Sequence, residues 1–129
     1  MAITHSTSAR NALADTTDDQ VNAGSTDSQG DLVIIDSTGP TDLITFNLQD
    51  PAFGAASSGT ITLQGTPIST TAGADGTADT FEARDKDNNM VYTGSVSGTG
   101  GGGDLEIDNT DVNSGQSAEL SSHSYTAPN

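Results

Sequence analysis

The apolar residues of this chain occur in short runs, and each run is closed by a cluster of turn-forming residues. Residues 32–35 form a β-branched run, and Ile44, Phe46 and Leu48 alternate with polar residues. A period of two is typical of a strand with one buried face. Further runs lie at 60–64, 81–83, 90–96, 105–107, 118–120 and 124–126. The pattern predicts a mainly β fold, an antiparallel β-sandwich or jelly-roll-like barrel.

The connections have different compositions. Residues 85–89, Asp-Lys-Asp-Asn-Asn, predict a hairpin turn because Asn and Asp tolerate positive φ. The stretch 69–79, rich in Gly, Ala and Thr, and the glycine-rich 98–103 are expected to be flexible loops. After Asp50-Pro51 the chain leaves its strand, and Phe53 is expected to be buried under the loop.

The first 24 residues have a helical pattern. Ser6 or Thr7 can cap the helix, and Ala9 and Leu13 form a narrow apolar stripe. The Asp- and Thr-rich residues 15–19 weaken any continuation, so we expect about two or three turns. We divide the chain into an N-terminal arm and short helix (1–24) and a β-sandwich domain (25–129). The helix covers an open end of the sandwich or docks on a partner, and the sequence favours neither.

The core is expected to be small. Of the 129 residues, 31% are hydrophobic and 4% aromatic, against roughly 45–50% apolar residues, glycine included, in ordinary domains. Domains with so little apolar material often gain stability from partners or from oligomerisation. We therefore expect a homo-oligomer, for which a symmetric trimer is one arrangement.

The charge is strongly one-sided. Eighteen Asp and Glu stand against three Lys and Arg, a formal net charge of −15. Such a surface repels phosphate and anionic lipid, which argues against nucleic-acid or membrane partners. The chain contains no cysteine, signal-peptide pattern or long apolar segment, so we expect synthesis in a cytoplasm.

Motifs for metal binding are incomplete. Residues 85–89 resemble the start of a calcium loop, but Met90 and Val96 stand where glycine and a bidentate glutamate are required. A looser calcium site around Asp104, Asp108 and Asp111 stays open. His5 and His123 lack the spacing of a helical zinc site. We therefore assign no metal ligands.

Catalytic patterns are also incomplete. Residues 98–103 match G-x-G-x-x-G, but an acidic, strand-like segment follows instead of a helix. Ser121-Ser122-His123 lacks the elbow of a serine hydrolase. Five aromatic residues are too few to line a glycosidase cleft and also fill a core. We expect no enzyme, and assign no catalytic residues and no cofactor.

Three segments resemble a group of small structural proteins of tailed bacteriophages. They are residues 1–15, residues 50–56 and residues 85–94 (DKDNNMVYTG). The resemblance implies a virion component, above all a decoration (cement) protein on the exterior of the head. The implied partner is the major capsid protein, and the implied place of synthesis is the cytoplasm of a host bacterium. An anionic protein is well tolerated on that surface and poorly tolerated beside packaged DNA.

For such a protein we expect the N-terminal segment to contact the shell. The residues we assign to this contact are Ile3, His5, Arg10 and Leu13, with Arg10 as an isolated positive anchor. The alternative function is a tail-fibre or adhesion module, in which loops 69–79 and 98–103 contact a host glycan.

Overall fold

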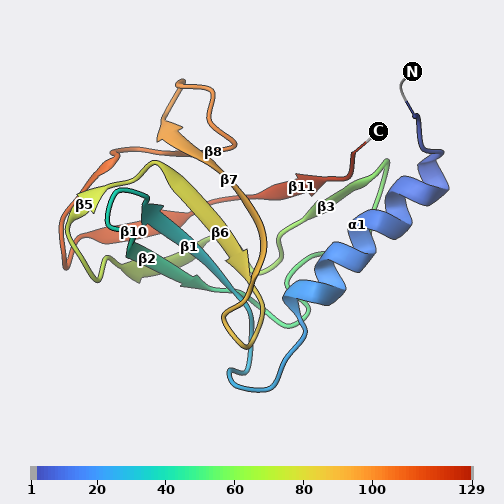
Figure 1. Ribbon diagram of the computed structural model, residues 1–129, viewed down its shortest axis with the longest axis horizontal. Helices are drawn as coiled ribbons and strands as arrows, with labels where there is room; N and C mark the ends of the chain where they lie inside the picture. Colours follow the sequence, from blue (N-terminus) through green and yellow to red (C-terminus); the bar gives the residue numbers. More distant parts are fainter. Residues whose placement is uncertain (1–2, 129) are drawn as a thin grey trace.

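A computed structural model describes residues 3–128, and within them the chain forms one helix and eleven strands (Figure 1). This arrangement confirms the predicted mainly β fold with an N-terminal helix. The elements are α1 (Thr7–Val21), β1 (Asp31–Asp36), β2 (Thr41–Asn47), β3 (Thr60–Thr62), β4 (Ile68–Thr71), β5 (Gly76–Thr77), β6 (Thr80–Arg84), β7 (Met90–Gly98), β8 (Leu105–Ile107), β9 (Asp111–Val112), β10 (Ser117–Leu120) and β11 (Ser124–Thr126).

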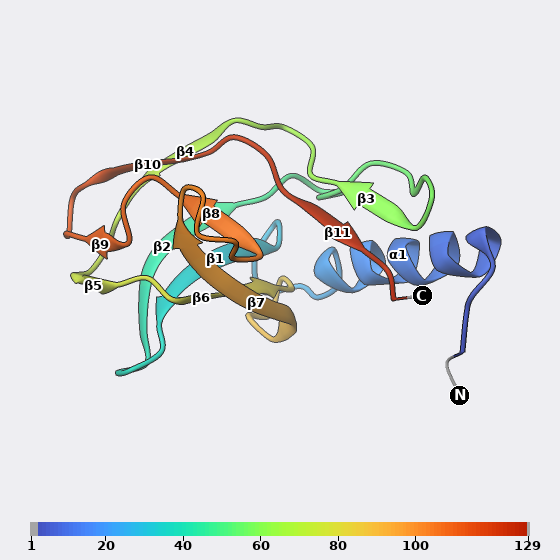
Figure 2. The same cartoon turned by 90° about the horizontal axis from the view of Figure 1, so that it is seen from above.

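Five strands form a curled sheet in the order β2-β1-β6-β7-β8 (Figure 2). Its neighbours are antiparallel, except that β8 runs parallel to β7. The six remaining strands form two-stranded antiparallel ladders, β4 with β10, β3 with β11 and β5 with β9. Most strands of these ladders are short, so each ladder depends on packing against the larger sheet.

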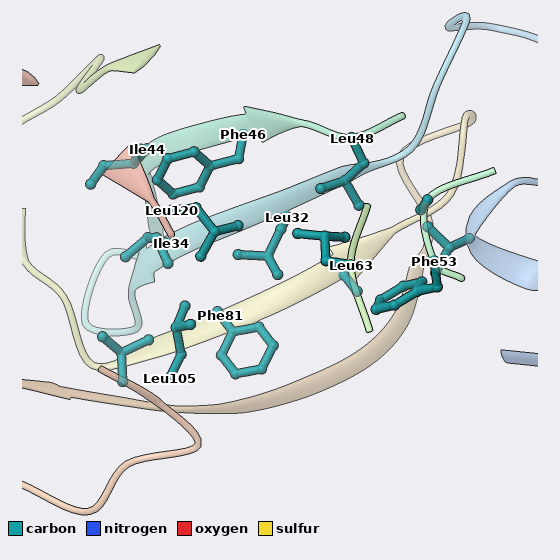
Figure 3. Close-up of a cluster of buried hydrophobic side chains, with 14 of the residues drawn as sticks. Leu32, Ile34, Ile44, Phe46, Leu48, Phe53, Leu63, Phe81, Leu105 and Leu120 are labelled. Atoms are coloured by element: carbon teal, nitrogen blue, oxygen red, sulfur yellow. The ribbon is translucent and has the colours of Figure 1, made fainter. Parts of the chain in front are cut away.

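The core lies between the five-stranded sheet and the ladders packed over it. Ile44, Ile34 and Phe81 are neighbours across β2, β1 and β6, and each is buried. Figure 3 shows Leu120 of β10 and Leu105 of β8 directed into the same cluster. The predicted burial of Phe53 is confirmed, since its exposed fraction is 2%.

The helix is longer than the sequence suggested. It runs to Val21 and is capped by Asn22, whereas we expected the acidic segment 15–19 to weaken it after two or three turns. Asp15 and Asp18 accept hydrogen bonds from backbone amides of a neighbouring loop. The acidic residues therefore fix the helix to the domain instead of ending it.

The buried face of α1 also differs from the predicted stripe. Ala14 and Val21 are fully buried and belong to the same core as the strands, while Leu13 is 41% exposed. The helix lies at one end of the molecule beside β3 and β11 (Figures 1 and 2). Of the two placements that the sequence left open, the structure therefore has the helix covering one end of its own domain.

The stretch 69–79 is not the flexible loop that its composition suggested. It contains most of β4, which pairs with β10, and all of β5, which pairs with β9. Both partners come from the last fifth of the chain, so local composition could not reveal them. The hairpin at 85–89 is confirmed: β6 and β7 are antiparallel, and Asn88 has a φ of +65°.

Candidate functional site

The N-terminal arm and the outer face of α1 carry most of the exposed apolar side chains. Ser6 caps the helix by accepting a hydrogen bond from the amide of Ala9. Before the cap, Ile3 is 77% exposed, and the arm extends beyond the end of the helix (Figure 1). Leu13 lies on the outer face. These two predicted contact residues are accessible to a partner.

A stripe of four polar side chains binds α1 to the loop between β2 and β3. The spacing of the four places them on one helical face, and each oxygen accepts a backbone N–H bond at 2.7–3.2 Å. The accepting residues are Asn11, Asp15, Asp18 and Asn22. The donating amides are those of Gly59, Ala56, Phe53 and Ala52. The stripe satisfies loop amides that no ladder pairs, and so it holds the helix rigidly against the domain.

Arg10 and His5 are directed toward the protein rather than fully into solvent. Arg10 is half-buried, and its Nη2 donates to the carbonyl of Ala127 at 3.3 Å. Its guanidinium lies over Gly59, where a Cβ would come within 2.8 Å of Cζ. His5 is half-buried, and its Nδ1 has no hydrogen-bond partner among residues 3–128. Of the four assigned residues, therefore, Ile3 and Leu13 present the most surface.

The other two cationic side chains are also bound within the fold. Arg84 pairs with Asp42 and Glu82, both at 2.9 Å, and Lys86 pairs with Asp50 at 2.6 Å. The Asp42 hydrogen bond raises the pKa of Arg84 further. All three Lys and Arg of the chain thus bind acceptors of the same chain, and the surface offers anionic groups to a partner.

His123 belongs to a packed aromatic cluster. It is 7% exposed, and its ring lies 5.4 Å from that of Phe81 and 6.0 Å from that of Tyr92. Burial lowers the pKa of His123 to about 4 and raises the pKa of Tyr92. The Tyr92 hydroxyl and Nε2 of neutral His123 share a hydrogen bond of 2.7 Å. His123 is therefore part of the core packing.

The carboxylates of the 85–89 turn accept hydrogen bonds from backbone amides. Asp85 accepts bonds from the amides of Asp87 and Asn89, and Asp87 accepts bonds from the amides of Ser25 and Thr26. These bonds to Ser25 and Thr26 lower the pKa of Asp87. Within residues 3–128, no group of three or more His, Asp or Glu side chains is placed to hold a metal ion. Asp104, Asp108 and Asp111 therefore do not assemble into the looser calcium site.

The glycine-rich segment 98–103 wraps a carboxylate of its own chain. The amides of Gly100 and Gly102 donate to the two oxygens of Glu106. Both glycines have a φ of +83°, which aims their N–H groups inward. The loop that matched a nucleotide-binding pattern is thus filled by Glu106.

Asp31 is a buried acid that the sequence analysis did not single out. It is 6% exposed, and its Oδ1 has no hydrogen-bond partner in the described part of the chain. Burial raises the pKa of Asp31, Asp27 adds to this, and Arg84 opposes it. Its position directly before the apolar run 32–35 was the available signal for burial.

No family model, curated protein or solved structure matches this chain. Across residues 3–128, the single helix lacks the length and apolar character needed to cross a bilayer.

Proposed function

We propose that this protein is a bacteriophage head decoration (cement) protein, which binds the outer surface of the capsid shell and stabilises contacts between capsomers. One observation carries the proposal beyond the sequence resemblance. The three cationic side chains are all engaged within the fold, on a chain with a net charge of −15. Among residues 3–128, the charged groups left exposed for a partner are anionic.

A surface of one sign restricts the partner. Packaged DNA and anionic lipid repel it, whereas a positively charged protein surface attracts it and accelerates association. A shell offers the same binding site many times. When the bound copies are linked to one another, many weak contacts act together, so a modest affinity at each site is enough to stabilise the whole particle. The anionic domain therefore faces away from the genome, on the exterior of the virion.

The accessible apolar residues of the N-terminal region form the contact with the major capsid protein. Ile3 and Leu13 supply apolar area, while the polar stripe on the opposite face of α1 keeps the helix rigid during docking. A rigid element loses less conformational entropy on binding than a flexible arm. The protein assembles as a homo-oligomer, with a trimer as one arrangement.

The function is tested on particles of the encoding phage. Particles stripped of the protein should release their genome at a lower temperature or lower chelator concentration than intact ones, and adding the purified protein should restore resistance. Unchanged stability would argue against cementing, and localisation inside the shell or on the tail would overturn the proposal.

A matched set of variants tests the contact itself. Ile3→Ser and Leu13→Ser should each weaken co-sedimentation with stripped particles about tenfold or more, because each removes an aliphatic side chain that docking on the shell would bury. Met90→Ser is the control, since Met90 is 55% exposed but lies at the start of β7. Equal losses for all three variants would contradict the assignment.

We do not advance the glycan-binding alternative. One of its two loops contains β5 and most of β4, and the other is bound to Glu106, so no observation favours it.

A further inference from the structure

The β-structure has an open seam between β8 and the C-terminal strands. β8 is paired with β7 on one side, β10 with β4 and β11 with β3. Within residues 3–128, no ladder joins β8 to β10 or β11. Figure 2 shows the β10–β11 segment running past β8, and a groove of about 590 Å³ lies between them.

The seam continues toward the helical end of the molecule. A second hollow of about 480 Å³ shares Glu106 and Ser122 with the groove and reaches Thr62 of β3. One wall is the unpaired edge of β8, and the other is formed by the β4–β10 and β3–β11 ladders. In an edge strand, alternate N–H and C=O groups point away from the paired neighbour and can bond to another chain.

The groove has an apolar base and an acidic rim. Its base consists of buried or half-buried side chains from both layers, namely Ile44, Phe46, Ile107, Val112, Ala118 and Leu120. Its rim carries Glu106, Asp108 and Glu119, and the described residues lining it include no Lys or Arg. Glu106 is bound by glycine amides, whereas Asp108 and Glu119 are exposed.

This composition selects one kind of occupant. A second copy of this chain carries a charge of −15 and is repelled from this acidic rim, so the contacts of the proposed homo-oligomer use other surfaces. Nucleic acid is repelled for the same reason. An extended segment with alternating apolar and basic side chains matches the strand edge, the apolar base and the acidic rim of the groove. Its backbone bonds to the edge of β8, its apolar side chains face the base, and its cations meet Asp108 and Glu119.

We propose that the seam between β8 and β10–β11 is a strand-accepting site for an extended basic segment of a partner protein. The inserted strand completes the β-structure and covers the edge of β8. This goes beyond the contact through Ile3 and Leu13, which uses the arm and helix at another element of the fold. Binding of a peptide to the isolated protein tests this site, whereas the stability of stripped particles tests the proposed function. Either experiment can therefore fail without the other.

The probe is a blocked peptide of about six residues with alternating Val and Lys, a length typical of strands. Binding is measured by fluorescence anisotropy at about 0.15 M salt, where long-range attraction is screened. Two peptides are matched to it: a Val and Glu peptide, and the Val and Lys peptide with alternate amides N-methylated. The first should not bind, and the second should bind at least about tenfold more weakly, because it keeps its charge and loses backbone bonds.

Two double variants locate the site. Asp108→Asn with Glu119→Gln should weaken binding about 3- to 30-fold, as expected for two exposed ion pairs. Asp19→Asn with Asp27→Asn removes the same number of charges elsewhere and should have little effect. Equal losses in the two double variants would overturn the proposal. Equal affinity for the methylated peptide, or no binding of the Val and Lys peptide, would overturn it too.

Discussion

The Tyr92 hydroxyl lies 2.7 Å from Nε2 of His123, and the two rings are stacked within 13° of parallel. They come from β7 and from the segment before β11, so the contact joins the large sheet to the C-terminal ladder. Protonation of His123 makes both of its ring nitrogens donors and places a positive charge among buried aromatic rings, which weakens this junction.

The ionisation of His123 should follow this burial. Its pKa in the folded state is lowered to about 4, whereas in the unfolded chain it is about 6.5. The unfolded state therefore takes up a proton first, and His123 destabilises the fold as the pH falls from about 6.5 to 4. The ring-proton NMR signal of His123 should titrate with a midpoint near 4. A midpoint near the unfolded value would contradict the buried placement.

The polar stripe on α1 should contribute strongly to stability. In Asn11→Ala, the buried Gly59 amide loses its acceptor, which costs about 1–3 kcal/mol of unfolding free energy. Asp19→Ala is the control on the exposed side of the helix and should change stability by less than about 0.5 kcal/mol. Urea denaturation of both variants provides the measurement. Similar values for the two would show that the stripe does not hold the helix.

Asp31 should destabilise the protein at neutral pH. Because burial raises its pKa, the folded state favours the protonated acid, and the penalty applies above the folded pKa. Asp31→Asn should therefore gain about 1 kcal/mol at pH 7. The gain should shrink as the pH falls through the folded pKa and the wild-type acid is protonated. A gain that does not change with pH would point to another cause.

Gly94 should be intolerant of a side chain. It lies opposite Phe81 across β6 and β7, and a Cβ there would come within 2.6 Å of the buried ring. We expect Gly94→Ala to lose about 1–3 kcal/mol from overpacking. Gly73→Ala is the matched control, because no heavy atom lies within 4 Å of its Cβ position. Thermal unfolding of the two variants should separate them clearly.

Salt should stabilise this protein. With a net charge of −15, its carboxylates repel one another in the compact state. Only three ion pairs among residues 3–128 oppose that repulsion. Raising NaCl from about 0.02 M to about 0.5 M shortens the screening length several-fold, so the unfolding temperature should rise. Calorimetry at the two salt concentrations tests this. A fall would mean that the ion pairs outweigh the repulsion.

The sequence by itself determined the mainly β character of the fold, the hairpin at 85–89 and the anionic charge. Period-two alternation and turn chemistry act over a few residues, so Ile44 to Leu48 and Asn88 were readable locally. The assignment of Ile3, His5, Arg10 and Leu13 to the contact with the shell stays a prediction. The structure shows that Ile3 and Leu13 are exposed.

Only the tertiary structure decided the rest, because it depends on residues that lie far apart in the chain. Asn11 meets the amide of Gly59, and His123 meets Tyr92, and neither pairing has a local signal. The helix therefore extended through acids that, read locally, should have weakened it. The strand pairs of 69–79 and the open edge of β8 likewise follow from which distant segments meet and which do not.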